Sequence, residues 1–117
     1  MAAPNIVNVA TITGKTAVQA VGTSATAIVT NSGSSNKVFK VNALYVSNVD
    51  GSVVADITVD LFRSSTAYPI ASTVQVPPDS TLDLMSKSIY LEEGDTLRCT
   101  ASASGDLVAV CSYEEIS

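Results

Sequence analysis

Two carboxylates at an even spacing are the residues of this chain whose types and positions come nearest to a catalytic pair. Asp56 and Asp60 fall within one expected strand, four residues apart, so both side chains would lie on the same side of it. Paired carboxyl groups hydrolyse glycosidic bonds when they flank a sugar-sized cleft. Such clefts are usually lined by aromatic side chains, and only 5% of this chain is aromatic. We therefore interpret both carboxylates as part of a solvated strand face and expect no catalytic residue and no enzyme.

The chain contains no histidine, the side chain most often used as a general base and a common metal ligand. The turns Asp50-Gly51 and Glu92-Glu93-Gly94-Asp95 could offer carboxylate oxygens to Ca²⁺. Neither follows the alternating ligand pattern of a twelve-residue EF-hand loop. Acidic residues in tight turns usually serve turn geometry and solubility. We therefore expect no metal site and no bound cofactor.

The two cysteines lie on either side of a turn signal at residues 102–106. Cys99 and Cys111 would then be near cross-strand neighbours in a final hairpin, where a disulfide is geometrically conceivable. A chain that folds in a cytoplasm keeps its thiols reduced. The favoured interpretation is therefore two small, buried apolar side chains, with the pairing left open.

Composition limits the classes of partner. The 117 residues fit one domain, and a hydrophobic content of 46% argues against disorder. The net charge of −5 and six scattered cationic residues disfavour nucleic acid and anionic membranes. The first residues lack the pattern of a signal peptide, and no apolar run approaches the roughly 20 residues of a membrane span. We expect synthesis in a cytoplasm and a function based on contact with other proteins.

Turn signals divide the chain into short β-prone segments, a pattern typical of a sandwich or a barrel. These signals are Gly14, Gly22, residues 31–36, Asp50-Gly51, Ser64-Ser65, residues 77–79, Gly94-Asp95 and Gly105-Asp106. The expected strands cover residues 5–13, 15–21, 23–30, 37–48, 53–62, 68–76, 80–86, 88–91, 97–101 and 107–113. The sequence thus predicts an all-β fold, a single antiparallel β-sandwich that is jelly-roll-like. One domain would span residues 1–117, with residues 1–10 as a candidate N-terminal arm.

Three of these segments carry more detailed predictions. In residues 53–62, near-strict alternation predicts that Val53 and Ile57 face the core while Asp56 and Asp60 face water. In residues 37–48 both faces are partly apolar. One face carries Phe39, Val41, Ala43 and Tyr45, and the other carries Val38, Leu44 and Val46. Asp50-Gly51 indicates a hairpin, and Pro69 indicates an edge strand or a strand start.

Candidate contact residues follow from side-chain chemistry. Tyrosine joins an apolar ring to a polar tip and is common at interfaces, although core packing is at least as favoured for each of the four tyrosines, Tyr113 included. The segment 2–9 is apolar and uncharged, and it could add a strand to a neighbouring molecule. The candidate interface residues are Ile6, Val7, Val9, Tyr45, Tyr68 and Tyr90.

Four stretches of this chain resemble small virion structural proteins of tailed phages that infect marine bacteria, cyanophages above all. They are Met-Ala-Ala-Pro-Asn-Ile-Val-Asn-Val at 1–9, Leu-Tyr-Val-Ser-Asn-Val-Asp-Gly at 44–51, Ser-Ile-Tyr-Leu-Glu-Glu-Gly-Asp-Thr-Leu at 88–97 and Cys-Ser-Tyr-Glu-Glu-Ile at 111–116. The resemblance is one of overall character over nearly the full length. It contains no catalytic signature.

The resemblance implies a place, the virion, assembled in the host cytoplasm. The expected function is that of a capsid decoration or cement protein that bridges subunits of the head. Its partners would be the major capsid protein or other virion proteins, and the chain itself would form a homo-oligomer such as a trimer. Two alternatives remain open: a neck, collar or tail accessory protein, and a carbohydrate-binding module for host adsorption.

Overall fold

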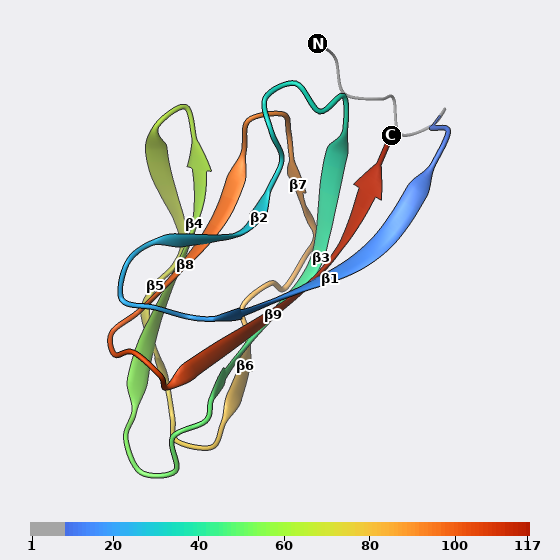
Figure 1. Cartoon of the computed structure of the whole chain (residues 1–117). Helices are drawn as coiled ribbons and strands as arrows, with labels where there is room; N and C mark the ends of the chain where they lie inside the picture. The colour runs from blue at the N-terminus through green and yellow to red at the C-terminus, as the bar shows by residue number, and fades with distance from the viewer. Residues whose placement is uncertain (1–8) are drawn as a thin grey trace.

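Residues 9–117 are described by the computed structural model shown in Figure 1. They form β1 (Ile12–Ala20), β2 (Thr26–Thr30), β3 (Val38–Asn48), β4 (Ala55–Arg63), β5 (Thr66–Val76), β6 (Thr81–Asp83), β7 (Ile89–Leu91), β8 (Thr96–Ala101) and β9 (Leu107–Ile116). Within these residues there is no helix long and apolar enough to cross a bilayer. The expectation of an all-β chain is confirmed.

Two antiparallel sheets pack face to face. Sheet A has the order β1-β9-β3, followed by β6 and β7, and sheet B has the order β2-β8-β4-β5. Because β6 pairs with one half of β3 and β7 with the other, the two act as a single interrupted strand. Each sheet then has four strands, in the order of a jelly roll. The predicted jelly-roll-like β-sandwich is therefore confirmed.

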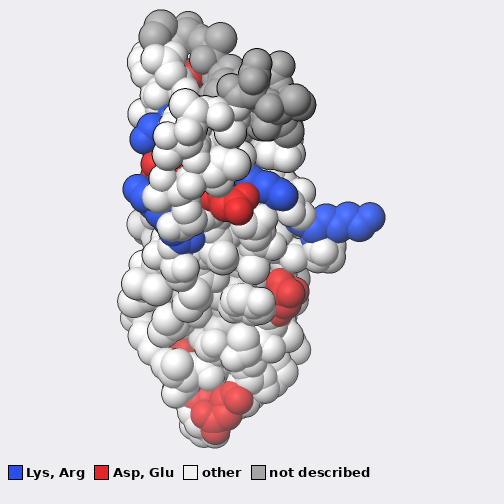
Figure 2. Space-filling view, turned by 90° about the vertical axis from the view of Figure 1, so that its right-hand side faces the viewer, with Lys and Arg blue, Asp and Glu red and all other residues white. Residues whose placement is uncertain are grey.

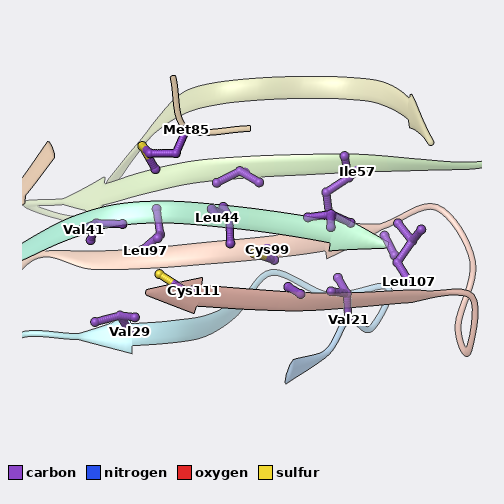
Figure 3. Close-up of a cluster of buried hydrophobic side chains, with 14 of the residues drawn as sticks. Val21, Val29, Val41, Leu44, Ile57, Met85, Leu97, Cys99, Leu107 and Cys111 are labelled. Atoms are coloured by element: carbon purple, nitrogen blue, oxygen red, sulfur yellow. The ribbon is translucent and has the colours of Figure 1, made fainter. Parts of the chain in front are cut away.

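The core lies between the inner faces of the two sheets and is built mainly from aliphatic side chains. Figure 3 shows Val41 and Leu44 of β3 together with Ile57 of β4 and Leu97 of β8, all of them fully buried. Alternate residues of each strand point into this layer, as the pleat requires. With only two phenylalanines and no tryptophan, the chain fills its core with Val, Leu, Ile, Ala and Cys.

A bulge in β3 overturns the predicted division of its faces. The pairing with β9 shifts between Val41 and Ala43, so Asn42 is an extra residue. Phe39 and Val41 therefore share the core face with Leu44 and Val46. The expected grouping of Phe39 and Val41 with Tyr45 was wrong, because the extra residue of the bulge changes which positions of the strand share a face.

The register predicted for β4 is confirmed at its centre and wrong at its ends. Ala55, Ile57 and Val59 are fully buried in the core. Val53, expected on the same face, precedes the strand and is 52% exposed. Asp60, expected in water, is buried beside Arg98, whose Nε donates to Asp60 Oδ1 at 2.8 Å.

The first expected strands are also different in the structure. Residues 5–8 of the predicted strand 5–13 lie outside the described residues, as does most of the candidate arm. Residues 9–11 are irregular, and β1 then runs without interruption through Gly14, which pairs with Glu114 of β9. Gly14 was expected to end a strand. It was misread because a glycine in a strand interior gives the same sequence signal as a turn.

Two expected hairpins are crossovers between sheets. Asp50-Gly51 connects β3 of sheet A to β4 of sheet B, and residues 102–106 connect β8 of sheet B to β9 of sheet A. The edge position predicted for Pro69 is confirmed, because it lies in β5, the last strand of sheet B.

Buried asparagines hold the crossovers at the two ends of the sandwich. Asn48 Nδ2 donates to the carbonyls of Val53 and Val76, each at 2.9 Å. At the other end Asn31 Nδ2 donates to the carbonyls of Lys37 and Leu91, also at 2.9 Å. These amides satisfy carbonyls at the ends of β5 and β7 and in the adjoining loops.

Candidate interaction surface

The outer face of sheet A carries apolar side chains where water would favour polar ones. Along β9, Ala109 and Cys111 are fully buried in the core, so the alternating Val108 and Val110 point outward. Val110 pairs with Val18 of β1 on one side and with Tyr45 of β3 on the other. Val18 is 73% exposed and Tyr45 is 44% exposed.

The neighbouring rows of this face are also uncharged across β1, β9 and β3. One row contains Ala20, Val108 and Ser47, and another contains Thr16, Ser112 and Ala43. We call these three rows, including Val18, Val110 and Tyr45, the outer apolar face. In these rows Thr16, Val18, Ala20 and Tyr45 are exposed, and the side chains of β9 between them are half-buried. Apolar surface of this kind usually marks a contact site.

The candidate tyrosines do not form one cluster. Tyr45 and Tyr90 both lie on the outer side of sheet A, where Tyr90 pairs with Lys40 of β3. Tyr68 belongs to sheet B, at the edge strand β5, and is 53% exposed. Tyr113 packs inward with its ring 5.6 Å from that of Phe39. Tyr45 and Tyr90 therefore lie on sheet A, apart from Tyr68 on sheet B.

Of the N-terminal candidates, Ile6 and Val7 lie outside the described residues. Val9 is half-buried and precedes β1. The predicted strand addition by segment 2–9 therefore stays a prediction.

Sequence reasoning missed Val18, Val108 and Val110 as surface residues. A signal for two of them was present in residues 107–111, which are Leu-Val-Ala-Val-Cys and therefore apolar at both parities. A strand with two apolar faces is covered by the core on one side and is available for contact on the other.

The two carboxylates first considered for catalysis have separate environments. Asp60 is bound to the guanidinium of Arg98, which also lies 4.0 Å from the ring centre of Phe62. Asp56 lines a depression of about 160 Å³ on sheet B, together with three threonines, Ala101 and Ser102. Only one carboxylate therefore reaches this depression, and the arrangement does not provide two carboxyl groups across a cleft.

The acidic turns bind the chain's own groups. Asp50 Oδ1 accepts hydrogen bonds from the amides of Ser52 and Val53 at 2.8 and 3.0 Å, and these bonds lower the pKa of Asp50. Gly94 has a φ of 92°, which the turn before β8 requires. In residues 9–117 no three His, Cys, Asp or Glu side chains gather closely enough to hold a metal ion.

Asp95, which is buried, forms an ion pair with Arg63, whose side chain is partly exposed. Arg63 Nε donates to Asp95 Oδ1 at 2.7 Å, and the amide of Glu92 donates to Asp95 Oδ2 at 2.8 Å. Burial alone would raise the pKa of Asp95, but these hydrogen bonds and the cationic guanidinium outweigh it and lower the pKa. The pair anchors the turn before β8 to the end of β4.

Both thiols are buried in the core and are not bonded to each other. Burial raises the pKa of Cys99 to about 12 and that of Cys111 to about 11. Figure 3 shows both sulfur atoms among aliphatic neighbours. The interpretation of two buried apolar side chains is confirmed, whereas their expected place on one hairpin was wrong, because β8 and β9 belong to opposite sheets.

Comparisons with known proteins give a fold relationship. No protein-family model matches this sequence, and no curated protein matches it. A solved structure from Bacillus, described as an endospore appendage in a family of disulfide-linked pili, is similar with a TM-score of 0.54. The sequences are 16% identical, and the similarity covers 92% of this chain and 88% of that chain. At this identity the likeness extends to the fold alone.

Proposed function

We propose that this chain is a non-enzymatic structural protein of a phage virion and that it decorates the capsid by bridging neighbouring head subunits. The observation that carries the proposal is the outer apolar face of sheet A. Its Val18 and Tyr45 side chains are exposed and Val110 between them is half-buried, so covering them with a partner is favourable. The resemblance to small virion proteins of marine phages is the reason for proposing the virion as the location of this chain.

The fold relationship supports a role in assembly. The Bacillus protein with the same fold is described as part of an appendage, which is also a structural assembly. That appendage family is described as disulfide-linked, whereas both cysteines of this chain are buried. Assembly of this chain would therefore depend on buried surface area and not on covalent links between subunits. A decoration protein of this kind stabilises a shell because it binds the assembled state and not the dissociated one.

The first test is the number of copies per virion, measured by quantitative mass spectrometry against the major capsid protein. We expect hundreds of copies, as repeated decoration of a head requires. About a dozen copies would instead favour the neck, collar or tail. Absence from purified particles would overturn the virion assignment.

A second test locates the contact. Particles that lack the protein are incubated with purified wild type, Tyr45→Ser or Tyr68→Ser, and bound protein is measured after sedimentation. Both tyrosines are about half exposed, but they lie on different sheets. We expect Tyr45→Ser to lose binding and Tyr68→Ser to keep it. The reverse result would assign the contact to sheet B.

A further inference from the structure

Among residues 9–117 the two sheets leave four edges without a further strand, and three of them are unsuitable for pairing with another strand. On sheet B, β2 has only five residues and a register shift after Ala27. The β5 edge carries Pro69, two register shifts in its pairing with β4 and a positive φ at Thr73. The remaining edge of sheet A is made of two three-residue pieces, β6 and β7. Short strands, prolines and bulges are the usual means of protecting an edge.

The fourth edge, β1, has none of these protections. Its nine residues pair with β9 in an unbroken register from Ile12 to Ala20. Its single charged residue is Lys15, whose Nζ lies 2.9 Å from Glu115 Oε2 of the same molecule. Seven of the nine residues are exposed. A long, regular, nearly uncharged edge of this kind is a template for a further strand.

We propose that β1 pairs antiparallel with β1 of a second copy of this chain, across a two-fold axis close to Thr16. In this register Val18 lies opposite the partner's Gly14, and Lys15 lies opposite the partner's Ala17. No two like charges are therefore placed directly opposite each other, as a stable antiparallel pair requires. The two sheets A join into one, and the outer apolar faces of both copies become continuous.

The distribution of charge favours this antiparallel arrangement. β1 ends beside the tip of the molecule that carries Asp50, Asp79 and Asp106. Two backbone hydrogen bonds hold these residues together: the amide of Asp79 donates to the carbonyl of Asp50, and the amide of Val49 donates to the carbonyl of Asp106. Figure 2, which views the side of the molecule that bears β1, shows Asp and Glu side chains but no Lys or Arg at the lower tip. The cationic Lys15 and Lys37 lie toward the opposite end, around Glu115.

Antiparallel pairing keeps the acidic tips of the two copies apart and brings each tip toward the cation-bearing end of the other copy. A parallel arrangement would place the two acidic tips side by side. Repulsion between like charges disfavours that parallel arrangement. This inference concerns a second copy of the chain and does not depend on the virion assignment.

The test is the molecular mass in solution, measured by sedimentation equilibrium. Wild type is expected at twice the 12.0 kDa chain mass. Val18→Lys places a solvated charge on the edge and is expected to halve the measured mass. The matched control is Val53→Lys, an exposed valine away from β1, which should retain the doubled mass. Wild type that stays at the single-chain mass at its highest soluble concentration, or Val18→Lys that keeps the doubled mass, would overturn the proposal.

A cross-linking test checks the position of the axis. A residue on the two-fold axis faces its own copy, so Thr16→Cys is expected to form a disulfide-linked dimer on mild oxidation, seen on a non-reducing gel. The native thiols are buried and do not compete. Ser72→Cys, exposed on the β5 edge, is the control and should remain monomeric. Equal cross-linking of both variants, or of neither, would contradict pairing through β1.

Discussion

At the residue scale, the acidic side chains of this protein stabilise its own turns and strand ends. Asp95 is bound by Arg63 and by the amide of Glu92, Asp50 by the amides of its own turn, and Asp60 by Arg98. The sequence showed carboxylates at suggestive spacings but not their partners. The amides come from the same turn, whereas Arg63 and Arg98 come from other strands, and the fold alone brings these two within hydrogen-bonding distance.

The Asp95 ion pair predicts a dependence of stability on pH. Because the pKa of Asp95 is below its ordinary value of 3.8 in the folded state, its contribution is complete above that value and is lost as pH falls through the folded pKa. We expect Asp95→Asn to lower the free energy of unfolding by about 1–3 kcal/mol at neutral pH. The difference from wild type should disappear in strong acid. Denaturant titrations at a series of pH values would measure it, and a difference that does not change with pH would refute the role of the charge.

The buried cysteines predict an unreactive native state. Burial raises the pKa of both Cys99 and Cys111, so little thiolate forms and access is blocked. A thiol-reactive reagent should label neither residue in the folded protein and both after denaturation. Mass spectrometry of the labelled chain gives the count. Rapid labelling of native protein at neutral pH would show that the core around these residues opens.

At the scale of elements, β4 provides a test of where strand alternation begins. Ile57 is fully buried, whereas Val53 is half exposed although it has the same parity. Ile57→Asp buries a charge without a partner and is expected to unfold the chain. Val53→Asp should change the free energy of unfolding by no more than about 0.5 kcal/mol. Circular dichroism and thermal melts of the two variants decide this, and a stable Ile57→Asp protein would disprove the register of β4.

The turn between β8 and β9 predicts a difference between two glycines. Gly105 has a φ of 84°, a conformation that side chains with a Cβ rarely adopt, whereas Gly33 has no such φ and open space around it. Gly105→Ala is expected to cost about 1 kcal/mol or more. Gly33→Ala should be close to neutral. Urea denaturation of both variants measures the contrast, and equal midpoints would rule out the strain at Gly105.

At the scale of the whole molecule, the jelly roll joins strands that are distant in sequence. Of the seven strand pairings among residues 9–117, only β4–β5 links consecutive strands. Loops must therefore close before most contacts form, and folds of this type refold in milliseconds to seconds. Stopped-flow circular dichroism should detect a concentration-independent phase in this range. Complete refolding within microseconds would contradict such a dependence on distant pairings.

The sequence by itself determined the fold class, the centre of β4 and the edge position of Pro69. Each of these depends on a local cause, which is the period of two in a strand or the missing amide of proline. The buried state of the two cysteines was also predictable, because each alternates with apolar residues in its strand and cysteine behaves as a small apolar side chain.

Tertiary structure decided the rest. The bulge at Asn42 reversed the faces of half of β3. At Asp50-Gly51 a crossover between the sheets took the place of the expected hairpin. Both features depend on which distant strand pairs with β3 and with β4. The open edge of β1 was likewise invisible in the sequence, and of the outer apolar face only Val108 and Val110 gave a signal, in the apolar run at residues 107–111. A strand's burial is set by what covers it, and the arrangement of the two sheets leaves Val18, Val110 and Tyr45 uncovered.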